Sequence, residues 1–93
     1  MSELLARYLK KAGLSERIAQ AGVLEAWPAL VGERIARNAR AVAVRDDGVL
    51  LVRVRSAPWA QELSLMTPQV IARINAGRTD GRISGIHWTS GRD

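Results

Sequence analysis

The sequence has no cysteine and no phenylalanine, and its 93 residues include one histidine, one tyrosine and three tryptophans. The lack of cysteine excludes disulfides, thiolate metal ligands and a cysteine nucleophile, and it is typical of a reducing cytoplasm. No run of roughly eighteen apolar residues and no charged-then-apolar leader occurs, so we expect no membrane span and no signal peptide. With so few aromatic side chains, a platform for stacking bases is not expected.

Side chains that carry out chemistry are equally scarce. With a single histidine, His87, and no cysteine, a zinc site is not expected, and turn chemistry accounts for the adjacent carboxylates of Asp46 and Asp47. The sequence contains neither a GxxxxGK[ST] phosphate loop nor a GxGxxG fingerprint. We therefore expect no enzymatic activity, no metal, no cofactor and no small-molecule substrate.

Positive charge is what the sequence has in excess. Lys and Arg number 14 against 9 Asp and Glu, a net charge of +5, which favours polyanionic partners. Six arginines lie between positions 34 and 55, opposed there only by two aspartates. The candidate nucleic-acid-binding residues are these arginines and two lysines near the N-terminus: Arg34, Arg37, Arg40, Arg45, Arg53, Arg55, Lys10 and Lys11.

Hydrophobic periodicity predicts helices before residue 39. Residues 2–12 are expected to form a short amphipathic helix, a second helix starts near Ser15, and a further helical segment runs from about residue 23 to residue 38. Gly32 lies inside this last pattern. Because glycine is unfavourable in a helix interior, its presence predicts that another backbone packs closely against it.

The segment 39–56, ARAVAVRDDGVLLVRVRS, predicts a β-hairpin that turns at Asp46-Asp47-Gly48. A three-residue loop, with Gly48 in the left-handed conformation, separates apolar from basic side chains better than a two-residue loop does. The buried face then receives Val42, Val44, Leu50, Val52 and Val54. The opposite face receives Ala41, Ala43, Arg45, Leu51, Arg53 and Arg55.

Beyond the hairpin, the pattern predicts helix and then strand. Ser56 is expected to cap a helix whose apolar stripe continues to Ile74. The Thr67-Pro68 pair either kinks this helix or starts a new one with Thr67 as its cap. The segment RISGIHWT, residues 82–89, is expected to form the last strand.

The resulting order is helix, helix, strand, strand, helix, strand. This order predicts one α+β domain over residues 1–93, with a three-stranded sheet covered by helices on one face. Arg53 and Arg55 then stand about 6.6 Å apart on the open face, close to the phosphate spacing of an extended single strand. That face is interpreted either as a phosphate-binding surface or as a solvated surface whose charge prevents edge pairing.

The segments WPALVG, ARNARAV, SAPWAQEL and VIARIN, in this order and around a glycine hairpin, resemble the DciA family over about residues 24–88. The resemblance implies a KH-like domain that contacts DNA, acts as a loader or operator of the bacterial replicative helicase DnaB, and has no ATPase of its own. The family's marker positions correspond to Trp27, Gly32, Trp59 and Leu63, which we interpret as packing residues. Two departures are notable: no GxxG loop joins the helices near Thr67, and the long flexible tail common in the family is not found before the chain ends at Asp93.

The leading hypothesis is a DNA-replication accessory protein of the cytoplasm and nucleoid. It would bind single-stranded or forked DNA without sequence preference and contact DnaB through its folded domain, with no membrane partner. A protein-interaction adaptor with an acidic partner is the alternative from another class. An RNA-binding KH-like protein is a third hypothesis.

Overall fold

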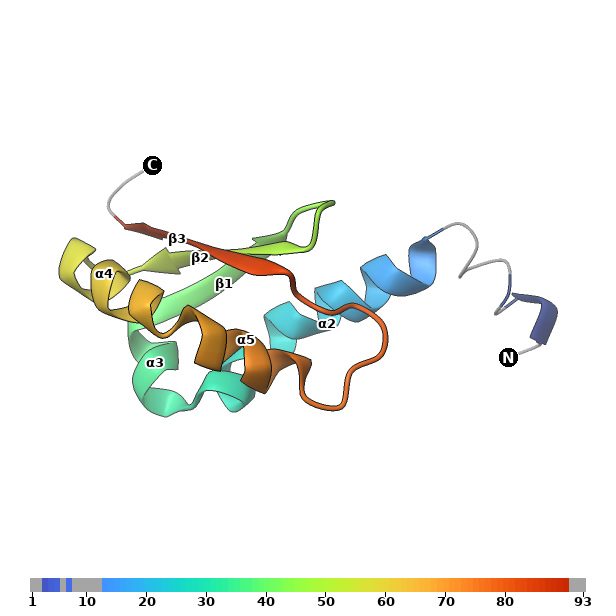
Figure 1. The fold of residues 1–93 in the computed structure, drawn as a ribbon, viewed down its shortest axis with the longest axis horizontal. Coiled ribbons are helices and arrows are strands. Elements are labelled where there is room, and N and C mark those ends of the chain that lie inside the picture. Colours follow the sequence, from blue (N-terminus) through green and yellow to red (C-terminus); the bar gives the residue numbers. More distant parts are fainter. Residues whose placement is uncertain (1–2, 6, 8–12, 91–93) are drawn as a thin grey trace.

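The computed structural model describes residues 3–5, 7 and 13–90 (Figure 1). Residues 3–5 and residue 7 are helical; the remainder of the helix predicted over residues 2–12 lies outside the described residues. From residue 13 onward the elements are α2 (Leu14–Val31), α3 (Glu33–Asn38), β1 (Ala39–Val44), β2 (Val49–Val54), α4 (Ala57–Leu65), α5 (Thr67–Asn75) and β3 (Gly85–Ser90). The predicted α+β class is confirmed.

The three strands form one mixed sheet in the order β1-β2-β3. β1 and β2 pair antiparallel through the hairpin, while β2 and β3 pair parallel and are connected by α4 and α5. Such a parallel pair requires a crossover, which the two helices supply. Helices α2 to α5 lie on one face of the sheet, and within the described part of the chain no helix covers the other face (Figure 1).

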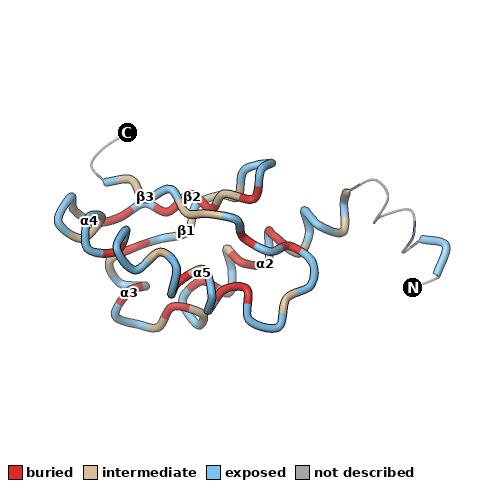
Figure 2. Tube along the Cα trace, viewed as in Figure 1, coloured by how far each residue is buried: buried red, intermediate tan, exposed pale blue. Residues whose placement is uncertain are grey.

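The hydrophobic core fills the space between the covered face of the sheet and the helices (Figure 2). Its buried residues are Val23, Trp27, Val31, Ile35, Ala39, Leu50, Val52, Val54, Leu63, Val70, Ile74 and Ile83. Trp59, Ile86 and Trp88 are partly buried against this cluster. Alternation along β2 therefore directs its even-numbered aliphatic side chains inward and Arg53 outward, as predicted.

The hairpin turn has the predicted three-residue loop. The Arg45 N–H donates to the Val49 carbonyl at 2.9 Å, which leaves Asp46, Asp47 and Gly48 between the paired residues. Gly48 has φ of +85°, a conformation that glycine adopts without steric cost.

The faces of β1 differ from the prediction because of a β-bulge. The register shifts between Ala41 and Ala43, so that Ala41 pairs with Val52. Val42 is consequently 47% exposed, while Ala41 packs against the core. The predicted burial of Val42 and exposure of Ala41 are wrong, because one extra residue in a strand inverts the side chains beyond it.

Gly32 separates α2 from α3, and its role differs from the predicted one. A Cβ placed on Gly32 meets no atom within 4 Å, so the expected close backbone approach is wrong. Gly32 instead has φ of +92°, which ends α2 and allows the chain to start α3 in a new direction.

The boundary between α4 and α5 is a break between two helices. Ser56 caps α4, as predicted, by accepting a hydrogen bond from the Trp59 N–H at 3.5 Å. Met66, and not Thr67, occupies the N-cap position of α5. Thr67 is the first residue of α5, and its Oγ1 accepts a hydrogen bond from the Trp88 indole at 2.8 Å, which ties the helix to β3.

The loop that leads into β3 is held by two polar contacts. The buried Asn75 amide donates to the Ile83 carbonyl at 2.9 Å and accepts from the Ile83 N–H at 2.8 Å. Gly81 donates its N–H to Glu16 Oε1 at 2.9 Å. Gly81 also lies so close to α2 that a Cβ there would be 2.8 Å from the Gln20 backbone nitrogen. These contacts determine where β3 joins the sheet.

Candidate nucleic-acid interface

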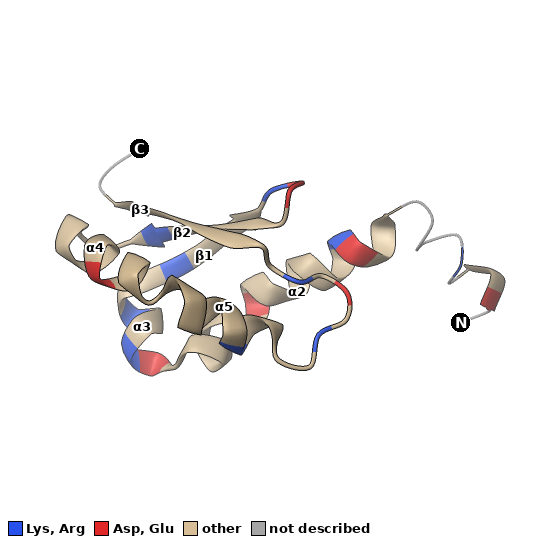
Figure 3. Ribbon diagram, in the orientation of Figure 1, with Lys and Arg blue, Asp and Glu red and all other residues tan. Residues whose placement is uncertain are grey.

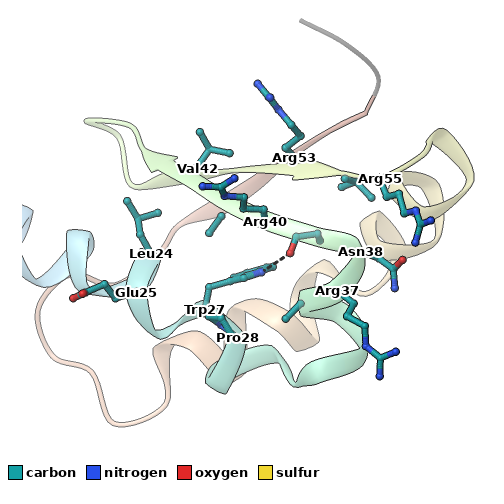
Figure 4. Close-up of a pocket in the computed structure, with 14 residues that line it drawn as sticks. Leu24, Glu25, Trp27, Pro28, Arg37, Asn38, Arg40, Val42, Arg53 and Arg55 are labelled. Atoms are coloured by element: carbon teal, nitrogen blue, oxygen red, sulfur yellow. Dashed lines mark hydrogen bonds between the residues drawn. The ribbon is translucent and has the colours of Figure 1, made fainter.

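A groove of about 780 Å³ follows the outer edge of β1, between that strand and helices α2 and α3 (Figure 4). α2 supplies its apolar wall through Leu24, Trp27 and Pro28. Four arginines surround it: Arg37 of α3, Arg40 of β1, Arg53 of β2 and Arg55, which directly follows β2. Among the described residues that line this arginine groove, Glu25 is the one acidic side chain.

The local fold explains why these arginines converge. Arg37 lies in the last turn of α3, two residues before β1 begins. Arg40 of β1 is directly opposite Arg53 of β2 in the antiparallel register. The pairing extends one residue further, since the Arg55 N–H donates to the Asn38 carbonyl at 2.8 Å. The end of α3 and the open end of the hairpin therefore share one corner of the molecule.

The four arginine side chains are exposed and spread around this corner. Arg53 points away from the helices, Arg40 extends along β1 near Val42, and Arg37 and Arg55 point outward (Figure 4). Basic segments gather where α3, β1 and β2 meet (Figure 3). The charges of these arginines add up to a positive potential at this corner, which attracts a polyanion. A bound polyanion would also relieve the repulsion between like charges that lie opposite each other on adjacent strands.

The floor of the groove is a rigid aromatic contact. Trp27 is 2% exposed, and its indole N–H donates to the Ala39 carbonyl at 2.9 Å. Its ring also packs near that of Trp88, with ring centroids 6.3 Å apart. Trp27 therefore links α2 to β1 through the hydrogen bond and to β3 through the ring contact, and these two contacts position the helix against the sheet.

Arg37 also belongs to an ion pair along α3. Its Nη2 lies 3.1 Å from Glu33 Oε1, and the two side chains are 72% and 82% exposed. An exposed i, i+4 pair of this kind contributes at most about 0.5 kcal/mol. Arg37 can therefore exchange this carboxylate for a phosphate at small cost.

Two of the other predicted arginines lie away from the arginine groove. Arg34 is exposed on α3 but does not line the arginine groove. Arg45 is at the far end of the hairpin, where its guanidinium pairs with Asp47 at 2.6 Å. Lys10 and Lys11 lie outside the described residues. The structure thus brings together half of the arginines and lysines that the sequence suggested.

The hairpin tip gives a pH-dependent signal. The side-chain hydrogen bond from Arg45, followed by the backbone N–H of Val49, holds the pKa of Asp47 below its ordinary value. A carboxyl group whose pKa is lowered by folding stabilises the hairpin above its ordinary pKa, and this contribution is lost as the pH falls through the lowered value.

We expect the NMR shift of the Val49 amide to titrate with a midpoint below that of an unperturbed aspartate. An Asp47→Asn variant should lose this titration; if the variant keeps it, another group is responsible.

Sequence reasoning missed the apolar wall of the groove. Leu24 and Pro28 are part of an ordinary amphipathic helix pattern, and Val42 was assigned to the core. No pattern in the sequence marks the bulge that exposes Val42, since the alternation of β1 reads equally well without it. A second missed contact is the ion pair between Arg17 of α2 and Asp46, at 2.9 Å.

The fold and the groove together define a small α+β domain with a concentrated basic corner. Within residues 3–5, 7 and 13–90, no group of three or more His, Asp or Glu side chains is placed to hold a metal ion. The helices of this same part of the chain are all too short or too polar to span a membrane.

Comparison with known proteins identifies the family. The family model described as "Dna[CI] antecedent, DciA" matches residues 1–87. A UPF0232 protein of Mycobacterium bovis is 46% identical over 67 residues, which cover 72% of this chain and 35% of the relative. A UPF0232 protein of Rhodococcus jostii is 36% identical over 80 residues, which cover 86% of this chain and 42% of the relative. The chain belongs to the DciA family, as its motifs predicted, and spans less than half the length of these curated relatives.

Proposed function

We propose that this protein is a non-enzymatic accessory factor of bacterial DNA replication. In this proposal it binds DNA through the arginine groove and assists the loading or activity of the replicative helicase DnaB. Family membership supports a role in replication, since the family's description names it the antecedent of Dna[CI]. The observation that carries the DNA contact is that Arg37 of α3, Arg40 of β1, Arg53 of β2 and Arg55, which follows β2, surround one groove.

The chemistry of the groove favours backbone contacts over base recognition. Guanidinium groups bind phosphate oxygens through paired N–H donors. The aromatic ring in the floor, Trp27, is buried and already hydrogen-bonded, so it is not exposed as a stacking surface. Binding through phosphates alone is independent of sequence and depends strongly on salt. Single-stranded or forked DNA at a nucleoid replication site fits this mode.

The salt dependence of DNA binding tests this assignment. If about four phosphates of a single strand are engaged, the log–log slope of affinity against salt concentration should lie near −3. Fluorescence anisotropy of a labelled single strand, followed across a salt series, gives the slope directly. A slope near zero would contradict a phosphate-binding groove, and an equally tight RNA of the same sequence would favour the RNA-binding alternative.

The helicase role is tested separately with the purified DnaB of the same bacterium. We expect the protein to increase unwinding of a forked DNA substrate when DnaB is limiting. A pull-down from nuclease-treated extract distinguishes the proposed DNA-binding factor from the alternative, a protein-interaction adaptor with an acidic partner. Retention of DnaB together with no measurable DNA binding would assign the arginine groove to an acidic protein partner.

A further inference from the structure

β1 is an edge strand, and part of its outer edge is free for pairing. Ala39 is already satisfied on that side, because its N–H donates to the Ile35 carbonyl and its carbonyl accepts from the Trp27 indole. Hydrogen-bonding direction alternates along an antiparallel pair. Ala41 therefore directs its backbone groups away from β2, and beyond the bulge Val44 does the same, as the Arg45–Val49 bond shows.

A channel runs beside this edge for the length of the strand. Toward the hairpin tip, a second groove of about 290 Å³ lies between α2 and β1. It shares Leu24 and Val42 with the arginine groove, so the two lie end to end beside β1. We call the combined feature the β1 channel. Its small and aliphatic lining includes Ala21 on the helix side and Ala43 on the strand side, and its polar lining is Arg17, Gln20 and Asp46.

We propose that the β1 channel binds an extended acidic peptide of a partner protein, which adds to β1 as a fourth strand. An edge strand that faces a helix across a groove is the arrangement in which strand addition gives affinity through main-chain hydrogen bonds and specificity through alternate side chains. This inference goes beyond the proposed DNA contact and does not depend on it.

Charge determines which peptide fits. One end of the channel carries the four arginines of the arginine groove, and the other end carries the Arg17–Asp46 pair, which is neutral overall. Acidic side chains of the peptide are therefore expected at the arginine end, with small aliphatic ones over Ala21. A second copy of this chain is a poor occupant, because it carries the same net charge of +5 and the channel ends in four arginines.

Synthetic peptides provide the first test. The probe is a fluorescein-labelled peptide of alternating glutamate and valine, six residues long like β1. Its control has the same sequence with every backbone nitrogen N-methylated, which keeps the charge but leaves no main-chain N–H to donate a hydrogen bond. We expect the control to bind at least about tenfold more weakly. Equal binding of the two would overturn strand addition, because attraction by charge alone would account for it.

A pair of matched variants provides the second test. Ala21→Tyr places a large side chain in the β1 channel outside the arginine groove, whereas Ala29→Tyr makes the same change at an exposed position of α2 that lines neither groove. We expect Ala21→Tyr to weaken peptide binding by about tenfold and Ala29→Tyr to change it by less than about twofold. DNA affinity should be the same in both variants.

The outcomes separate this inference from the proposed function. Loss of DNA binding together with peptide binding in Ala21→Tyr would assign the whole channel to nucleic acid and overturn the peptide site. Unchanged peptide binding in Ala21→Tyr would also overturn it, with the DNA contact unaffected. Peptide binding that persists in a protein with no DNA affinity would support the channel and contradict the proposed DNA contact.

Discussion

Replacing Arg40 and Arg55 together with serine is expected to lower DNA affinity by about 25-fold at 0.1 M salt. Each phosphate contact that is lost on a single strand removes about 0.7 of a released counterion, which corresponds to about fivefold in affinity at this salt concentration. The salt slope should become shallower by about 1.4. Both side chains are exposed and line the arginine groove, so the fold should be retained. Anisotropy titrations at several salt concentrations measure both effects.

The matched control removes the same charge elsewhere. Arg34 and Arg73 are exposed on α3 and α5 and do not line the arginine groove. The double variant Arg34→Ser/Arg73→Ser should lose less than about threefold in affinity, the part that net charge alone contributes. Equal losses in the two double variants would show that DNA responds to the overall charge of the protein and not to this groove.

Asn75→Ala is expected to destabilise the protein by about 2–4 kcal/mol. The Asn75 amide satisfies both backbone groups of Ile83, and both residues are buried. Alanine leaves one buried N–H and one buried carbonyl without their partner, and each unmade hydrogen bond costs about 1–3 kcal/mol. Urea denaturation followed by circular dichroism measures the free energy of unfolding.

Asn38 offers the control for this substitution. Its amide donates to the Arg34 carbonyl at 2.9 Å, but this contact is exposed, so water can replace it. Asn38→Ala should therefore cost less than about 1 kcal/mol. If Asn75→Ala is no more destabilising than Asn38→Ala, the loop before β3 does not depend on the two hydrogen bonds between the Asn75 amide and the Ile83 backbone.

The hairpin shows both the reach and the limit of sequence reasoning. Its turn was predictable because Asp46-Asp47-Gly48 has a local conformational preference that needs no tertiary information. The bulge at Val42 was not predictable, because it depends on α2. Trp27 occupies the space below β1 and hydrogen-bonds the strand at Ala39, which leaves room for alanines on the inner face. Residues far apart in the chain thus decide which side of β1 is buried.

The arginines illustrate the same division. Alternation along β2 was enough to direct Arg53 outward, because its neighbours in the strand are aliphatic. The count of charges could not distinguish Arg45 from Arg40, since Arg40 lies in β1 and Arg45 directly follows the same strand. The structure separates them through Asp47, which pairs with Arg45 at the hairpin tip, and through α3, which ends beside Arg40. The family resemblance identified the protein, but the groove itself became visible only in three dimensions.

The contact between Trp27 and Trp88 makes the docking of the last strand observable without a label. The two rings are inclined at 58° with centroids 6.3 Å apart, so we expect their indole transitions to couple and to give an exciton band in circular dichroism. One chromophore belongs to α2 and the other to β3. We expect the band to disappear when β3 separates from α2, and its return during refolding to report when the parallel crossover closes.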